Sequence, residues 1–339
     1  MVDDAHDVSS RTCASVACEA KWRRIMRAAV EIGSSSTRLM IVDGKGTVRA
    51  RMEARTAVAK GMVAERYQPI AGTSARAFDA ERTWMGRKDG ENDVSKADRT
   101  YRIVSEGFEP TLVALRHFRA KLQAEDVADV QAVATGAFRE ACNGTRLLMQ
   151  ASEVLGCQVR LMPYEEEGRT AALAARKSTG LRTAHVADLG GWTCELVDLH
   201  DQVHSMPIGC IAMSKLLKQA TNNPKDTCLE IVRKELHQRC IGHIYGYPLL
   251  ILGGTATSIA AMHLQLPRYD PSRVNKTVLS MKTIADLSSK ETNADYWVER
   301  RDTMKAGAYT LIGIMSILGV EEATVSDVDL LEGLLLLEN

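Results

Sequence analysis

The sequence predicts an α/β protein built from two related lobes, and three observations lead to this prediction. Segments with strand and helix periodicity alternate along the chain, which is typical of α/β folds. A strand that ends in acid–apolar–glycine occurs twice, as Glu31-Ile-Gly-Ser and as Asp188-Leu-Gly-Gly, and each copy leads into a return strand. The length of 339 residues exceeds that of most single domains. Two copies half a chain apart indicate a pseudo-duplicated fold and not a solenoid.

The first lobe is predicted over residues 27–160, after a polar N-terminal extension (1–26) that we expect to be disordered. Apolar runs predict strands over 27–33, 38–42, 47–54, 129–134 and 159–162. A helix is predicted over 101–123, with Val113, Leu115, Phe118 and Leu122 on its buried face. Residues 66–100 are polar and have little periodicity, so they form an insertion that is either a lid over a cleft or an inert surface loop.

The second lobe is predicted over residues 161–322, followed by a closing segment over 323–339. Apolar runs predict strands over 184–189, 195–199, 249–252 and 324–327. Helical patterns cover 165–175, 211–237, 257–264, 282–289 and 303–318, and an apolar helix begins at Leu330.

Composition excludes several classes of function. The 43 Lys+Arg balance the 43 Asp+Glu, which argues against a protein that coats nucleic acid or membranes through its overall charge. Aromatic residues make up only 5%, too few to expect a platform for stacking nucleic-acid bases. The N-terminus has no apolar signal segment, and the eight cysteines form no CxxC pair. We therefore expect free thiols, a cytoplasmic location, and neither a nucleic-acid nor a membrane partner.

Three turns rich in Gly, Ser and Thr follow predicted buried strands. Such turns gather backbone N–H groups into a concavity that can hold a phosphate. Any one of them could be an ordinary turn, since none matches GxxxxGK[ST] or GxGxxG, but two matched copies and a third favour a phosphate-binding cleft. The candidate phosphate-binding residues are Gly33, Ser34, Ser35 and Ser36, then Gly190, Gly191, Trp192 and Thr193, and finally Gly253, Gly254 and Thr255.

Acidic residues beside these turns suggest a metal ion. Glu31 and Asp188 each precede a glycine by two positions, where a carboxylate next to bound phosphate requires a bridging cation such as Mg²⁺. Glu195 could hold a metal-bound water; alternatively, the acids cap their own turns. Glu167, within Glu165-Glu166-Glu167, is either a base that activates water or part of an acidic run at a helix N-terminus. Arg139 and Arg169 are candidate phosphate clamps or surface charges.

Taken in order, the motifs resemble those of the exopolyphosphatase/guanosine pentaphosphatase (Ppx/GppA) family, in the acetate and sugar kinase/Hsp70/actin superfamily. The family's D-x-G-S-N-S and D-I-G-G-G-S-T-E loops resemble 31–36 and 188–195, and its third loop resembles 253–255. T-x-A-x-R-E-A-x-N resembles 135–143, S-G-x-E-E-A-R resembles 163–169, P-x-G resembles 207–209, and S-D-x-x-L-x-E-G-L-L resembles 326–335. Sugar kinases share the loops but lack the R-E-A-x-N and E-G-L-L elements.

The resemblance covers residues 27–337 and implies two actin-like (ribonuclease H-like) lobes with a cleft between them. It implies that 323–339 returns to the first lobe, in a short form without the C-terminal HD-like extension of longer members. The implied activity is Mg²⁺-dependent hydrolysis of the terminal phosphoanhydride of polyphosphate or the 5′-γ-phosphate of pppGpp, by a possible homodimer. By position, Glu167 would be the base, Asp188 and Glu195 would organise metal and water, and Arg139 would contact phosphate.

The chain also departs from the family pattern at five positions. Trp192 stands in place of the third glycine of the second loop, where it either narrows the site or reshapes the loop. Cys194 replaces a Thr, Tyr164 replaces a Gly, Glu31 replaces an Asp and Ser35 replaces an Asn. These departures motivate an alternative to the hydrolase: a regulatory protein that binds a nucleotide or polyphosphate with little turnover. A kinase of the same superfamily is a third hypothesis. The balanced charge favours short polyphosphates or nucleotides as ligands.

Overall fold

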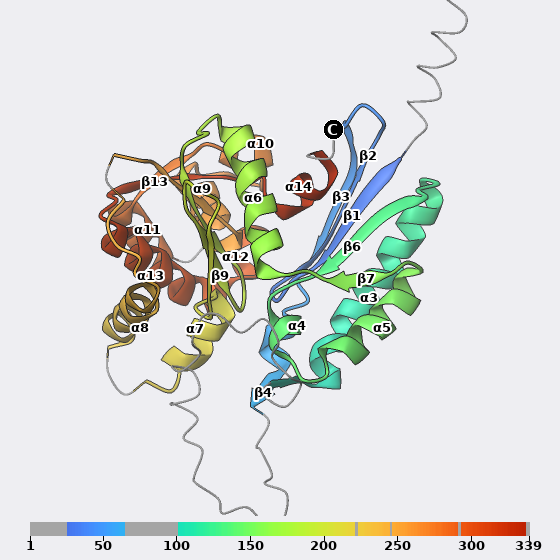
Figure 1. The fold of residues 1–339 in the computed structure, drawn as a ribbon, viewed down its shortest axis with the longest axis horizontal. Coiled ribbons are helices and arrows are strands. Elements are labelled where there is room, and N and C mark those ends of the chain that lie inside the picture. The colour runs from blue at the N-terminus through green and yellow to red at the C-terminus, as the bar shows by residue number, and fades with distance from the viewer. Residues whose placement is uncertain (1–25, 65–100, 221–222, 245, 291–292, 337–339) are drawn as a thin grey trace, which may run out of the picture.

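The computed structural model describes residues 26–64, 101–220, 223–244, 246–290 and 293–336 (Figure 1). The predictions for the N-terminal extension and for the insertion over 66–100 lie outside the described residues. The described chain forms two lobes, each built around one mixed sheet.

The first lobe contains a five-stranded sheet in the order β3-β2-β1-β6-β7. Its strands are β1 (Arg27–Ile32), β2 (Thr37–Val42), β3 (Val48–Ala54), β6 (Asp129–Ala134) and β7 (Val159–Leu161). Strand β2 is antiparallel to β1 and β3, whereas β6 is parallel to β1 and β7. Helices α3 (Ser105–Ala124) and α5 (Gly144–Leu155) pack together on the outer face (Figure 1).

A small second sheet lies at the base of this lobe. It pairs β4 (Met62–Ala64) with β5 (Tyr101–Ile103), next to the turn of 3-10 helix η1 (Val58–Gly61) and close to α4 (Ala137–Glu140). Residues 101–103 form strand β5, so α3 begins at Ser105, four residues after the predicted start of the helix. Its buried face is also corrected: Leu115, Phe118 and Leu122 are buried, but Val113 is 42% exposed. Val113 lies two positions before Leu115, and two residues of an α-helix turn through about 200°, so Val113 lies on the opposite side of the helix.

The second lobe contains a six-stranded sheet in the order β10-β9-β8-β11-β13-β12. Its strands are β8 (His185–Leu189), β9 (Cys194–Val197), β10 (Val203–Met206), β11 (Leu249–Leu252), β12 (Val278–Ser280) and β13 (Glu322–Val325). The first five positions repeat the order and directions of the first sheet. This repetition confirms the predicted pair of related lobes, each with the same sheet topology. One prediction was wrong: β13 was expected to return to the first lobe, but it pairs with β11 and β12.

Seven helices of the described residues surround the six-stranded sheet of the second lobe. They are α7 (Cys210–Leu217), α8 (Pro224–Gln238), α9 (Gly254–His263), α10 (Pro271–Val274), α11 (Met281–Ser288), α12 (Asp295–Val298) and α13 (Arg301–Leu318). Helix α13 packs against α7, α8, α9 and α11, and twelve of its residues are buried. The helical pattern over 211–237 corresponds to two helices, α7 and α8, and α8 begins with Asn223 as its N-cap and a proline at its first turn.

Two helices lie between the sheets and join the lobes. They are α6 (Tyr164–Thr179) and α14 (Leu330–Leu336) (Figure 1). Helix α14 contacts β1, β2 and α6, so the closing helix returns to the first lobe as expected. Helices α14 and α6 approach closely at Gly333, where a Cβ would lie 2.5 Å from the Thr170 side chain. Apolar residues of both sheets join these helices in one core, which fixes the strand ends that carry the glycine turns.

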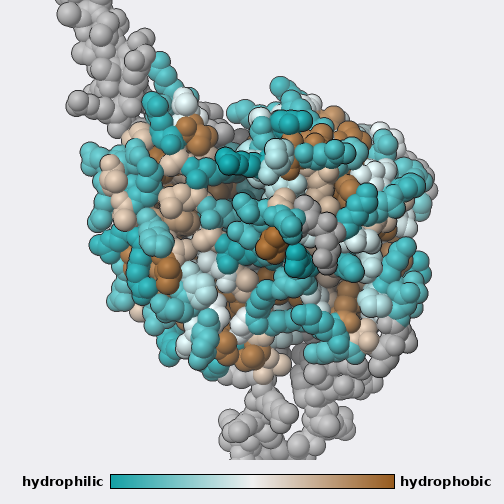
Figure 2. Space-filling view, turned by 180° about the vertical axis from the view of Figure 1, so that it is seen from behind, coloured by the Kyte–Doolittle hydropathy of each residue, from teal (hydrophilic) through white to brown (hydrophobic). Residues whose placement is uncertain are grey.

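Figure 2 shows one face of the molecule, on which hydrophilic residues predominate and hydrophobic ones are scattered. Among the described residues, no helix combines the length and the apolar character needed to cross a bilayer.

Candidate functional site

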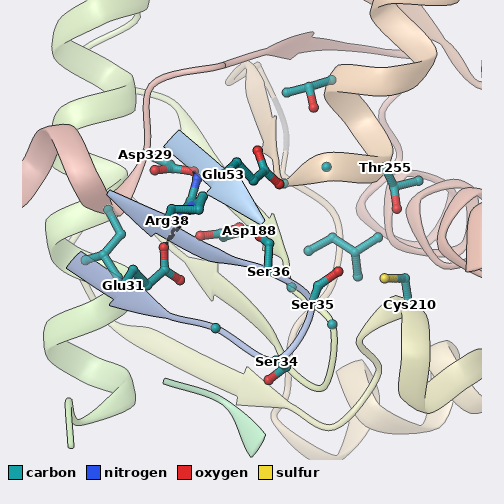
Figure 3. Close-up of a pocket in the computed structure, with 18 of the residues that line it drawn as sticks. Glu31, Ser34, Ser35, Ser36, Arg38, Glu53, Asp188, Cys210, Thr255 and Asp329 are labelled. Carbon is teal, nitrogen blue, oxygen red and sulfur yellow. Dashed lines mark hydrogen bonds and ion pairs between the residues drawn. The ribbon is translucent and has the colours of Figure 1, made fainter. Parts of the chain in front are cut away.

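A cleft of about 490 Å³ lies between the lobes, where β1 and β8 end in their glycine turns (Figure 3). All three predicted loops line this cleft. So do the predicted acids Glu31, Glu167, Asp188 and Glu195. Of the predicted site residues, Arg139 and Trp192 do not line it. The sequence motifs, which are dispersed over 225 positions from 31 to 255, therefore meet at one place.

The first two loops have the same local geometry and contact each other. The amide of Gly33 donates to the Ser36 carbonyl at 2.9 Å, and that of Gly190 donates to the Thr193 carbonyl at 3.0 Å. A Cβ on Gly191 would lie 3.0 Å from the backbone nitrogen of Ser35. Glycine at position 191 therefore allows the two loops to approach more closely than a residue with a Cβ would, because the contact is with backbone.

The second loop is anchored by the start of α7. The amide of Gly209 donates to the Trp192 carbonyl at 2.9 Å, that of Cys210 to Gly190 at 3.0 Å, and that of Ile211 to Gly191 at 2.8 Å. Across a trans peptide the carbonyl and the next N–H point in opposite directions. The N–H groups of residues 191–193 therefore point away from α7. The Trp192 side chain is 3% exposed and lies outside the cleft, so it reshapes the surroundings of the loop and does not narrow the site.

The third loop opens α9. Gly253 has a φ of 93°, and a Cβ there would lie 2.3 Å from the Leu189 carbonyl oxygen. A Cβ on Gly254 would lie 2.0 Å from Nη1 of Arg300. The Arg300 guanidinium thus lies against the N-terminus of a ten-residue helix, and both are positive.

Arg38 joins two acids inside the cleft. Its Nη1 donates to Oδ2 of Asp329 at 2.5 Å and its Nε donates to Oε2 of Glu31 at 2.9 Å (Figure 3). Burial raises the pKa of Glu31 to about 7, although Arg38 opposes this shift. Burial alone would also raise the pKa of Asp329, but the adjacent guanidinium holds that pKa below its ordinary value. At neutral pH this group of three is therefore a balance of one cation against one or two anions.

Arg139 holds the second pair of acids. It donates to Glu167, to Oε1 of Glu195 at 3.2 Å and to the Met162 carbonyl at 3.1 Å. Burial raises the pKa of Glu167 to about 7 and also raises the pKa of Glu195. In the structure the partners of Arg139 are these carboxylates and the Met162 carbonyl, and its contact with phosphate stays a prediction. Arg169, the other predicted clamp, donates to the Asp201 carbonyl at 2.9 Å and does not line the cleft.

Asp188 differs from the other acids of the cleft. Within the described part of the chain, its carboxylate has no hydrogen-bonding or ion-pair partner. Burial raises its pKa well above the ordinary value, and the nearby charges of Asp329, Glu195, Glu167 and Glu31 raise it further. A cation would relieve this repulsion, and Mg²⁺ is commonly held by one or two carboxylates together with substrate phosphates and water. The donor set around Asp188 therefore fits Mg²⁺.

Glu31 and Glu195, the other predicted metal ligands, are held by arginines. No group of three or more acidic, His or Cys side chains among the described residues is arranged to hold a metal ion by itself. A metal at Asp188 would thus take its remaining ligands from water or from phosphate oxygens. The roles of Glu31 and Glu195 as ligands stay a prediction.

Sequence reasoning missed several charged residues of the cleft. Arg38, Glu53 and Arg300 line it, and Arg300 Nη2 donates to Glu53 Oε1 at 3.0 Å across the two lobes. Arg38 gave only a weak signal, as a charged residue at the start of the apolar run Arg-Leu-Met-Ile-Val. Asp329 lies in the closing motif noted above, but nothing in that motif identifies its partner. Residues further out include Tyr269, Tyr296, Asp295 and Glu299, for which the sequence gave no signal.

Comparison with known proteins identifies the family and the fold. A family model described as the Ppx/GppA phosphatase family matches residues 94–338. The Ppx/GppA enzyme of Aquifex aeolicus is 24% identical, covers 93% of this chain and 99% of its own, and superposes with a TM-score of 0.66. An exopolyphosphatase-like protein is 20% identical, with coverages of 92% and 98% and a TM-score of 0.70. An exopolyphosphatase from Cytophaga hutchinsonii is 15% identical, with coverages of 91% and 96% and a TM-score of 0.67. At these identities the structural matches show the fold alone.

Proposed function

Because the chain belongs to the Ppx/GppA phosphatase family, we propose that it hydrolyses the terminal phosphoanhydride bond of inorganic polyphosphate or of a nucleoside polyphosphate such as pppGpp. Family membership supports phosphatase activity in general. One observation carries the finer proposal: a buried glutamate with a raised pKa, Glu167, lines the same cleft as three glycine loops.

The loops and two arginines would bind the phosphates. Backbone N–H groups of glycine-rich turns suit phosphate oxygens, and the Ser35 hydroxyl is buried without a hydrogen-bonding partner among the described residues. Arg38 and Arg300 line the cleft on opposite sides, and each guanidinium would bind phosphate oxygens in exchange for a present carboxylate partner. Backbone N–H groups carry no net charge, so the loops could hold a polyanion in a chain of zero net charge.

Glu167 would act as the general base. Its carboxylate accepts a proton from water while the water oxygen bonds to the terminal phosphorus and the bridging P–O bond breaks. The products are orthophosphate and a chain shorter by one phosphate. A base whose pKa is near 7 is well matched to this task at neutral pH. Arg139 would orient the carboxylate through its hydrogen bond.

Asp188 would hold Mg²⁺, for the reasons of charge and donor type given above. When bound, the ion would offset negative charge on the phosphate oxygens. Glu31 and Glu195 would join it only after exchanging their arginine partners for other groups.

The experiment is a phosphate-release assay with polyphosphates of defined length, pppGpp, ATP and GTP, each with and without Mg²⁺. We expect release from at least one substrate and its loss in Glu167→Gln, while the same ligand still shifts the melting temperature of that variant. Unchanged turnover in Glu167→Gln would remove this residue from the mechanism. Ligand binding without release by the unaltered protein would contradict the proposal and favour the regulatory alternative.

A further inference from the structure

Trp192 belongs to the second lobe in sequence but to the first lobe in packing. It lies in the loop between β8 and β9, and its side chain is buried in the hydrophobic core of the first lobe. Its ring packs edge-on against Tyr101 of β5, with 5.1 Å between ring centroids and an interplanar angle of 75°. Edge-to-face pairs of this kind are favourable beyond the apolar area they bury.

A lysine of the second lobe also contacts the Trp192 ring. Lys215 of α7 lies with Nζ 5.9 Å from the centroid of the Trp192 ring, within the range of a cation–π contact. The same Nζ donates to the Met62 carbonyl of β4 at 2.7 Å. One side chain of the second lobe therefore contacts both the indole and the small sheet of the first lobe.

The loop backbone next to Trp192 is closely packed on two sides. A Cβ on Gly209 would lie 2.4 Å from the Trp192 carbonyl carbon, so α7 presses directly on the loop. On its other side, Gly191 contacts the backbone of Ser34 and Ser35 in the first loop. The indole therefore extends from the point at which the two phosphate-binding loops meet.

We propose that Trp192 is a positioning residue that pins the second loop to the first lobe and so fixes the spacing of the two loops. The functional consequence rests on the proposed phosphate binding, but the pin itself does not depend on it. The family pattern has glycine at this position, which has no side chain to bury. In this chain, movement of the second loop away from the first lobe must withdraw an indole from an apolar core.

Hydrogen exchange of the ligand-free protein tests the pin without any assay of activity. In Trp192→Gly, we expect amides of residues 189–194 and 33–37 to exchange faster by about tenfold or more, because the loops separate locally. Tyr101→Ala should produce the same pattern through the other half of the contact. Trp192→Phe retains an aromatic ring and should exchange close to the unaltered protein.

Phe118→Ala is the matched control, since Phe118 is 1% exposed in the same core but lies on α3, away from the loops. It should lower the melting temperature while leaving exchange at 189–194 unchanged. The pin is refuted if Trp192→Gly leaves exchange in both loops unchanged, or if Phe118→Ala accelerates both loops as much.

Turnover then separates this inference from the proposed function. If the protein releases phosphate, Trp192→Gly should raise KM by about tenfold with a smaller change in kcat, since the loops bind phosphate in every state of the reaction. If the protein turns over no substrate but Trp192→Gly shows the expected exchange pattern, the positioning role of Trp192 is supported and the proposed function fails. If the protein turns over substrate but Trp192→Gly leaves hydrogen exchange unchanged, the proposed function is supported and the positioning role is refuted.

Discussion

Nη1 of Arg38 donates a 2.5 Å hydrogen bond to Oδ2 of Asp329, which lies 291 positions further along the chain. The same guanidinium also binds Glu31, so one cation serves two buried carboxylates. Asp329 immediately precedes α14, the helix that packs on β1 and β2. This ion pair therefore ties the closing helix to the strand pair that carries the first loop.

Removal of Arg38 should destabilise the protein strongly. Arg38→Met would leave Glu31 and Asp329 buried without their hydrogen-bonded cation, with only the charge of Arg51 near Asp329, and we expect a loss of about 3–5 kcal/mol in the free energy of unfolding at pH 7.5. The triple variant with Glu31→Gln and Asp329→Asn should recover most of this loss, because no charge remains unpaired. Arg116→Ala is the control: its pair with Glu109 is exposed, so its loss should cost less than about 1 kcal/mol. Urea denaturation measures all three.

The pH dependence of turnover should follow the ionisation of Glu167. Its pKa of about 7 predicts that kcat/KM rises about tenfold per pH unit below 7 and levels off above it. Since this pKa exceeds the ordinary value of 4.5, the same group makes folding less favourable as pH rises from about 4.5 to 7. Arg139→Met removes the charge that lowers this pKa, so the acid limb should move to higher pH. An unmoved limb would assign it to another group.

The Asp188 carboxylate should lower the melting temperature of the metal-free protein and should be needed for its response to Mg²⁺. In EDTA, Asp188→Asn removes a partly buried carboxylate that the surrounding acids repel, so we expect the melting temperature to rise by about 1–4 °C. In the unaltered protein, Mg²⁺ should raise the melting temperature, and in Asp188→Asn that response should disappear. Asp286→Asn, on the exposed surface of α11, should change neither value. A full Mg²⁺ response in Asp188→Asn would exclude this carboxylate as the ligand.

Gly191 should tolerate no side chain. In Gly191→Ala the new Cβ would lie 3.0 Å from the Ser35 nitrogen and 3.1 Å from the Ser34 carbonyl carbon, so the two loops must move apart by a few tenths of an ångström. We expect apparent affinity for the phosphate ligand to fall by about tenfold or more. Gly242→Ala is the matched change, because a Cβ there has no neighbour within 4 Å. Calorimetric titration with the best ligand compares the two, and equal affinities would mean that contact between the loops has no part in binding.

The sequence allowed the loops to be located because each is a local pattern: a buried strand, an acid and a glycine turn. It did not allow the position of β13 or the existence of β5 to be predicted, because both depend on pairing with strands far away in sequence. The ion pair of Arg38 with Asp329 could not be predicted either, because the two residues lie 291 positions apart. The direction of the Trp192 side chain depends on an apolar space in the other lobe, which no pattern around residue 192 encodes.

The ion pair between Glu53 and Arg300 should compete with substrate. Glu53 lies on β3 of the first lobe and Arg300 immediately before α13 of the second, so the pair crosses the cleft entrance, where the Glu53 side chain is 44% exposed. An exposed pair is worth at most about 1 kcal/mol, which corresponds to a factor of about five in affinity. Glu53→Gln should therefore lower KM for a polyanionic substrate by up to about fivefold and leave kcat unchanged. Glu109→Gln, an exposed acid on α3, should alter neither constant. A raised KM in Glu53→Gln would instead show that Glu53 holds Arg300 in the orientation that binds phosphate.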